Sequence, residues 1–178
     1  MQIKLDASPE DHRMAKLAAA ALGLTLLEAA LPSPLPGVKP GLANIVTLVV
    51  LARYGWRAAA WVTLLRVVAG SLLLGTFLSP SFMLSLSGAL ASLALLALAQ
   101  ALPARWFGPV THSILAALAH FAGQFALVYF WLIPHAGMIN LVPIFAAAAL
   151  FFGAINGIAA ATLLTRLPNT PQPACATP

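Results

Sequence analysis

The residues best suited to chemistry in this sequence lie inside long apolar runs. Arg66 is near the middle of one run, and His120 and Gln124 are near the middle of another. Because His120 and Gln124 are four residues apart, they share one face of a helix. An ionisable group at this depth in a bilayer is costly unless it is paired or hydrated, so each one is a functional candidate. Together a cation, an imidazole and an amide can donate hydrogen bonds to a polar or anionic ligand.

Further polar residues fall toward the ends of the apolar runs. If successive runs cross a membrane in alternating directions, several of these residues share its outer half, with Arg66 and His120 beneath them. We expect a polar cavity that opens outward and is capped by the Pro-rich loop 32–40. The predicted ligand-binding residues are Glu28, Lys39, Asn44, Arg66, Ser71, His120, Gln124 and Asn140.

Structural roles are open for the same residues. Arg66 and Glu28 can form an intramembrane ion pair that only supports the fold. His120 and Gln124 can form a hydrogen-bonded clamp between helices, which is worth only about 1 kcal/mol. Both alternatives stay open at the level of the sequence.

The composition indicates which elements position these residues. Only 7% of the residues are charged and 61% are hydrophobic, whereas roughly 25% of a soluble domain is charged. About 20 apolar residues span a bilayer core, and clusters of Pro and Gly divide the chain into six apolar runs. We predict an all-α polytopic membrane bundle of six transmembrane helices over residues 14–167, with a cytoplasmic segment 1–13 and a disordered cytoplasmic tail 168–178. The predicted helices are Met14–Leu31, Gly41–Tyr54, Arg57–Leu78, Ser81–Leu102, Phe107–Ile133 and Ile139–Leu167.

Asparagine and small residues in these helices have structural alternatives as well. Asn44 and Asn140 lie near helix starts and can serve as N-caps, where Asn is favoured. Asn156 lies deeper, and we expect it to be structural. Gly153 and Gly157 are expected to pack against a neighbouring helix or to let a ligand approach the backbone. The same choice applies to Gly70, Ser71 and Gly75.

The distribution of Lys and Arg predicts an orientation. With six spans, the side opposite the Pro-rich loop receives Lys4, Arg13, Lys16, Arg53, Arg57, Arg105 and Arg166, and the other side receives only Lys39. Both termini are therefore predicted to be cytoplasmic, with the protein in the inner (cytoplasmic) membrane. The basic residues are scattered singly, so the net charge of +5 does not indicate a nucleic-acid partner.

A stripe of small residues lies on the first predicted helix. Ala15, Ala19 and Gly23 recur every four residues, and such a stripe lets helix backbones approach closely. It can pack inside the bundle, or it can dock on a partner membrane subunit.

The residues exclude several chemistries. The sequence has no phosphate-binding G-x-x-x-x-G-K-[ST] loop, no G-x-S-x-G and no H-E-x-x-H. Its four acidic residues cannot supply an Asp-rich magnesium cluster. We expect no catalytic residue, no metal and no cofactor, and therefore a protein that binds rather than an enzyme.

Two longer motifs carry a family resemblance. The stretch from Leu35 to Asn44, and the stretch from Arg66 through Gly70, Ser71 and Gly75 to Pro80, followed by His120-x-x-x-Gln124, resemble the Gx transporter family. Its members are often labelled heptaprenyl diphosphate synthase component I. The family is similar to the S components of energy-coupling factor transporters, which implies six helices, an outward ligand pocket with a loop as its lid, and a small-residue stripe on the first helix that docks on the coupling subunit.

The expected function is a substrate-binding subunit for uptake of a small, anionic or polar nutrient. It would work in membrane lipid with a coupling transmembrane subunit and an ATPase pair. One alternative is an accessory membrane component of isoprenoid or quinone (heptaprenyl diphosphate) synthesis, and another is a structural membrane protein in which every polar pair serves packing.

Overall fold

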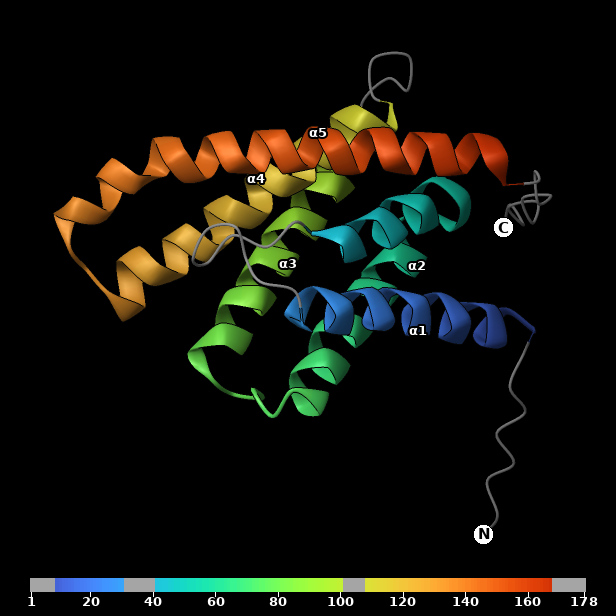
Figure 1. Cartoon of the computed structure of the whole chain (residues 1–178), viewed down its shortest axis with the longest axis horizontal. Coiled ribbons are helices and arrows are strands. Elements are labelled where there is room, and N and C mark those ends of the chain that lie inside the picture. Colours follow the sequence, from blue (N-terminus) through green and yellow to red (C-terminus); the bar gives the residue numbers. More distant parts are fainter. Residues whose placement is uncertain (1–8, 31–40, 101–107, 168–178) are drawn as a thin grey trace, which may run out of the picture.

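The computed structural model describes residues 9–30, 41–100 and 108–167, and the regular elements in these ranges are all helical. They form a bundle of five α-helices, with two short helical turns between the last two (Figure 1). The α-helices are α1 (Pro9–Ala30), α2 (Leu42–Leu73), α3 (Pro80–Ala99), α4 (Pro109–Leu127) and α5 (Val142–Arg166). The turns are the π-helical η1 (Val128–Leu132) and the 3-10 helical η2 (Ala136–Leu141). The predicted all-α class is confirmed, and the predicted number of six helices is not.

The difference in helix number arises at Gly55, inside α2. Gly55 has φ 80° and ψ −180°, a conformation that glycine adopts far more readily than other residues. The hydroxyl oxygens of Thr47 and Thr63 lie 3.1 Å apart, and each is eight residues from Gly55. The two halves of α2 therefore lie antiparallel, and the predicted helices Gly41–Tyr54 and Arg57–Leu78 are joined into one folded element without a loop.

Several observed helix ends differ from the predicted ones. α1 begins at Pro9, so part of the predicted segment 1–13 is helical. α2 ends at Leu73 rather than Leu78, because Gly75 and Leu78 have positive φ angles of 66° and 62° and form a turn. Ser79 then caps α3 by accepting a hydrogen bond from the backbone N–H of Phe82 at 3.4 Å. The predicted tail 168–178 lies outside the described residues.

Glycines allow α4 to approach both of its neighbours closely. A Cβ added at Gly157 of α5 would lie 2.7 Å from Cα of Val110, and one at Gly153 would lie 3.0 Å from Cβ of Ala117. On the other side, a Cβ at Gly123 of α4 would lie 2.7 Å from the carbonyl oxygen of Ser87 in α3. Packing through small residues is typical of membrane helices. The prediction that Gly153 and Gly157 pack internally is confirmed.

Four helical segments are long and apolar enough to cross a bilayer: Leu42–Leu73, Pro80–Ala99, Pro109–Leu132 and Ala136–Arg166. Large apolar side chains are exposed on the outside of the bundle, including Ile144, Phe151 and Ile158 along α5. This surface is compatible with a membrane protein. α1 is not among the four segments, so the predicted first span is confirmed as a helix but not as a membrane span.

Except for Arg66, the Lys and Arg residues of the described chain lie on segments at one end of the bundle. The N-terminal end of α1, the reversal between the two halves of α2 and the C-terminal end of α5 lie at the same end of the long axis, on the right in Figure 1. Arg53, beside that turn, donates through Nη2 to the carbonyl oxygens of Leu164 (3.3 Å) and Leu167 (2.8 Å) at the end of α5. The connection between α4 and α5 lies at the opposite end.

Candidate functional site

Glu28 connects α1 to the start of α2. Its side chain is buried, and Oε1 accepts a hydrogen bond from the backbone N–H of Leu42. This N–H belongs to the first turn of α2, where backbone donors have no partner within the helix and favour a negative charge. The N-cap residue is Gly41, in the left-handed region with φ 74°. The suggested N-cap role of Asn44 is therefore wrong, because a carboxylate from another helix meets these donors.

Arg66 lies in the second half of α2, and its guanidinium attracts the carboxylate of Glu28 electrostatically. Its Nε is buried and has no hydrogen-bond partner among the residues that the structure describes. A buried donor without a partner costs about 1–3 kcal/mol. The electrostatic attraction between Arg66 and Glu28 agrees with the predicted pairing. The Glu28 carboxylate binds the Leu42 N–H, however, and Nε of Arg66 is left without an acceptor among the described residues.

His120 lies on α4 and is held against α3. The imidazole ring makes a hydrogen bond with the backbone of Gly88 and experiences the charge of Arg66. A Cβ added at Gly88 would lie only 2.7 Å from the ring, so a glycine is needed for this contact. Glu28, Arg66 and His120, from α1, α2 and α4, thus influence one another electrostatically in sequence. His120 joins α4 to α3, as its part of the clamp alternative requires, and the part of Gln124 in that clamp stays a prediction.

Asn156 fastens α5 to the start of α2. This buried side chain donates through Nδ2 to the carbonyl oxygen of Gly41 at 3.2 Å. A Cβ on Gly41 would lie 3.2 Å from the same nitrogen. The expected structural role of Asn156 is confirmed, and the bond brings α5 to the same end of α2 as Glu28.

The other predicted ligand-binding residues are spread more widely. Ser71 is buried, and its hydroxyl donates to the carbonyl oxygen of Val68 at 2.8 Å, one turn earlier in the same helix. Asn44 and Gln124 are half-buried. Asn140 is exposed in η2 rather than at the start of α5, so its suggested N-cap role is wrong. Lys39 and the predicted lid loop lie outside the described residues.

The predicted partner-docking stripe on α1 faces outward. Ala15, Ala19 and Gly23 are exposed, and a Cβ added at Gly23 would meet no heavy atom of the described chain within 4 Å. By contrast, Gly70 of α2 packs on α1, where Thr25 and Leu22 would meet its added Cβ at 3.5 and 3.6 Å. The stripe therefore does not pack within the described bundle.

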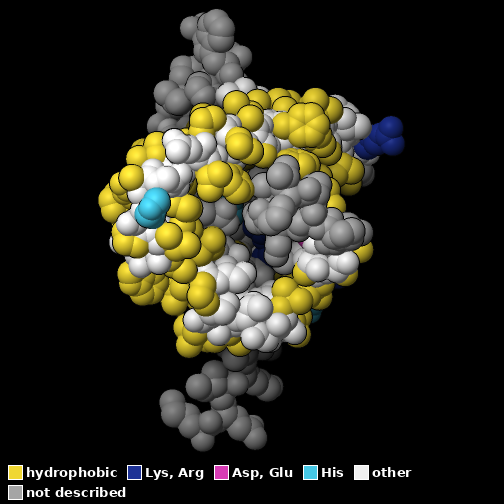
Figure 2. All heavy atoms as spheres, turned by 60° about the vertical axis from the view of Figure 1, so that its left-hand side comes forward, with side chains coloured by type: hydrophobic (Ala, Val, Ile, Leu, Met, Phe, Trp, Pro, Cys, Tyr) yellow, Lys and Arg dark blue, Asp and Glu magenta, His cyan; other side chains and the backbone are white. Residues whose placement is uncertain are grey.

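A hollow opens on the end of the molecule that lies on the left in Figure 1. Figure 2 shows it with a Lys or Arg side chain visible at its depth and with apolar and uncharged side chains around it. Within the described ranges, no group of three or more His, Cys, Asp or Glu side chains is placed to hold a metal ion.

Comparison with known protein families gives one match. The model of the family described as heptaprenyl diphosphate synthase component I matches residues 17–163, which is most of the chain. The chain belongs to this family. No curated protein and no solved structure matches it. The family resemblance seen in the sequence is therefore confirmed, and the likeness to S components of energy-coupling factor transporters stays a prediction.

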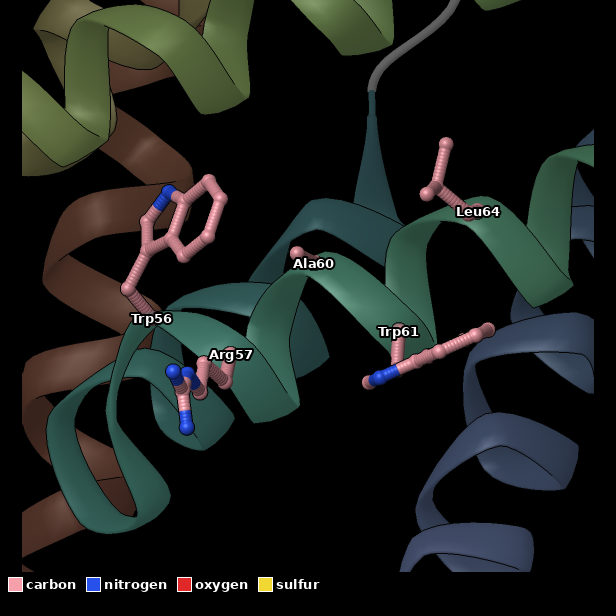
Figure 3. Close-up of a pocket in the computed structure, with 5 residues that line it drawn as sticks. All are labelled: Trp56, Arg57, Ala60, Trp61 and Leu64. Atoms are coloured by element: carbon pink, nitrogen blue, oxygen red, sulfur yellow. The ribbon is translucent and has the colours of Figure 1, made fainter.

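This member of the heptaprenyl diphosphate synthase component I family has a second concave site that the sequence analysis missed. A cavity of about 330 Å³ lies on the outer surface of the second half of α2 (Figure 3). In the sequence, Arg57 contributes only to the predicted orientation, and Trp56 and Trp61 on either side of it are not among the predicted site residues. Their spacing, with Trp61 one helical turn after Arg57, was the available signal. The lining residues are Trp56, Arg57, Ala60, Trp61 and Leu64.

Proposed function

We propose that the chain is a membrane-embedded, non-catalytic subunit that binds a small anionic or polar molecule at Arg66 and His120. The buried Nε of Arg66, which has no partner within the described ranges, carries this proposal. A carboxylate or phosphate oxygen of a ligand would accept this hydrogen bond and remove the cost of the unsatisfied donor. Glu28 attracts Arg66 and would position it, and apolar walls would exclude water.

Uptake of the bound molecule would need partners, because the sequence lacks an ATP-binding loop. The exposed stripe of Ala15, Ala19 and Gly23 would dock on a coupling transmembrane subunit that carries an ATPase pair. The absence of internal contacts at Gly23 supports this part of the proposal. In this arrangement the protein resides in the inner membrane with both termini in the cytoplasm, and the hollow of Figure 2 opens outward.

The family match favours a second candidate, an accessory membrane component of heptaprenyl diphosphate synthesis. Here Arg66 would bind the diphosphate of an isoprenoid, because an arginine fork matches phosphate oxygens. The exposed apolar side chains of the bundle would accommodate the prenyl chain. Both candidates place an anionic group at Arg66. They differ in the molecule that carries this group and in the proteins that assemble with the chain.

Mass spectrometry of small molecules carried through gentle purification tests the site. Arg66→Met removes the positive charge and the N–H donors. Arg66→Lys keeps the charge but lacks the planar set of donors of a guanidinium. We expect both variants to lose the copurifying anion while the helical circular dichroism signal is retained. A folded Arg66→Met protein that keeps its ligand would contradict the proposed site. Unfolding of both variants would instead assign Arg66 to the scaffold with Glu28.

Copurification distinguishes the two assemblies. Ala19→Leu adds bulk within the stripe, and Ala20→Leu adds it at another exposed position of α1. If the transport proposal holds, an ATPase module copurifies with the parent protein and with Ala20→Leu but not with Ala19→Leu. Copurification of a soluble prenyl diphosphate synthase subunit, with an isoprenoid diphosphate as the bound molecule, would support the second candidate instead.

A further inference from the structure

The cavity on α2 combines a cation and an indole on one side of a helix. Arg57 and Trp61 are one turn apart, and Figure 3 shows them projecting from the same side of α2. The indole nitrogen of Trp61 lies on the edge of the ring that faces Arg57. Trp56 forms a fixed wall, because its Nε1 donates to the carbonyl oxygen of Leu93 in α3 at 3.0 Å.

The two polar groups of this cavity are available to a ligand. Within the part of the chain that the structure describes, neither the Arg57 guanidinium nor the Trp61 indole N–H has a hydrogen-bond or ion-pair partner. None of the five lining residues is acidic. A guanidinium with a neighbouring N–H donor suits a phosphate, which accepts several charge-assisted hydrogen bonds.

An apolar track continues from this polar pair along α2. Trp61 is 66% exposed, and the exposed residues Leu65, Val68 and Leu72 follow it at helical spacing on the same face. The eleven helical steps from Trp61 to Leu72 extend about 16 Å along the helix. This is about half the thickness of the hydrocarbon core and therefore about one leaflet.

The location of Arg57 matches this geometry. It lies two residues from the Gly55 turn, at the end of the bundle where the basic residues gather. Tryptophan and arginine are favoured where a membrane helix meets the headgroup layer. The cavity of about 330 Å³ is at the lower limit of ligand pockets, about 300 to 1,000 Å³, so it suits a headgroup rather than a whole lipid.

We propose that this face of α2 binds one anionic phospholipid, with the phosphate at Arg57 and Trp61 and an acyl chain along Leu65, Val68 and Leu72. An anionic headgroup is favoured over a zwitterionic one because the cavity offers a cation and no acidic side chain for a choline or ethanolamine group. This site is separate from the Arg66 site, and its occupation does not depend on the function proposed above.

The test uses the full-length protein in nanodiscs made of equal parts phosphatidylglycerol and phosphatidylcholine. Native mass spectrometry measures which lipid remains bound after the disc is removed, and brominated forms of each lipid measure quenching of tryptophan fluorescence. The variants are Arg57→Gln, Trp61→Phe, which keeps an aromatic ring without the N–H, and Arg13→Gln, which removes an exposed cation from α1.

We expect the parent protein to retain phosphatidylglycerol about fivefold over phosphatidylcholine, the preference that one basic residue near an anionic surface provides. This preference should disappear in Arg57→Gln, decrease in Trp61→Phe and persist in Arg13→Gln. Equal retention of the two lipids by the parent protein would overturn the proposal. The same loss in Arg13→Gln as in Arg57→Gln would also overturn it, because general surface charge would then explain the binding. Unchanged binding by Trp61→Phe would exclude the indole as a phosphate donor.

Discussion

Gly157→Ala tests how closely α4 and α5 pack. A Cβ at residue 157 would lie 2.7 Å from Cα of Val110 and 2.9 Å from Cβ of Ser113. Carbon atoms in contact prefer separations of about 3.5–4.0 Å, so the two helices would have to move apart by about 1 Å. Because Val110 is met at its backbone, no side-chain rotation relieves the overlap. This separation would also weaken the other contacts between α4 and α5.

Gly23→Ala is the matched control, because an added Cβ at Gly23 meets no heavy atom within 4 Å. Both substitutions gain up to about 1 kcal/mol from the better helix propensity of alanine. Only Gly157→Ala also introduces overpacking, which costs about 1–3 kcal/mol. We therefore expect the free energy of unfolding of Gly157→Ala to be about 1–3 kcal/mol below that of Gly23→Ala. Gly153→Ala, with its closest contact at 3.0 Å, should fall between them.

The assay is reversible unfolding in mixed micelles with an increasing fraction of sodium dodecyl sulfate, followed by circular dichroism at 222 nm. The wavelength reports helix content directly, and the midpoint gives the order of stability of the three variants. If Gly157→Ala unfolds at the same denaturant fraction as Gly23→Ala, the close approach of α4 and α5 is refuted. A graded series in the expected order would support the packing contacts individually.

Two further predictions concern the reversal at Gly55 and the hydrogen bond between Glu28 and the start of α2. Gly55→Ala, which places a side chain at φ 80°, should destabilise the bundle by about 1–3 kcal/mol, whereas Gly23→Ala, also in open space, should not. Equal unfolding midpoints would show that a side chain is tolerated at residue 55, contrary to the strain expected from its positive φ. Glu28→Gln keeps an acceptor for the Leu42 N–H but removes the attraction to Arg66, so it should be less destabilising than Glu28→Leu, which removes both. Equal stability losses in the same assay would argue against the hydrogen bond to Leu42.

The fold was predictable from the sequence where prolines and glycines interrupt apolar runs. α3 starts at Pro80, one residue before the predicted Ser81, because Ser79 is a favoured N-cap residue and proline is favoured in the first helical position. The reversal at Gly55 could not be predicted, because Tyr-Gly is equally compatible with a loop and with a single residue of positive φ. Its conformation depends on the packing of the two halves of α2, including the contact between Thr47 and Thr63.

The candidate site was predictable in its central members. Arg66 and His120 were identified by the cost of placing them in a bilayer, and the structure brings them within electrostatic range. Their partners were not predictable, because backbone groups supply several of them. The Gly88 backbone binds His120, and Leu42 offers its N–H to Glu28, and neither residue has a side chain that signals this role.

In the membrane-embedded arrangement proposed above, the reversal at Gly55 has a consequence for how the chain is inserted. The first half of α2, Leu42–Tyr54, is about 20 Å long and is too short to cross a hydrocarbon core of about 30 Å. It therefore lacks the length of an independent insertion signal and must be integrated during synthesis together with the segment that follows it. The Thr47 and Thr63 hydroxyls would meet lipid without partners until both halves arrive. Biogenesis of this region is thus expected to proceed through a helical hairpin rather than through successive single helices.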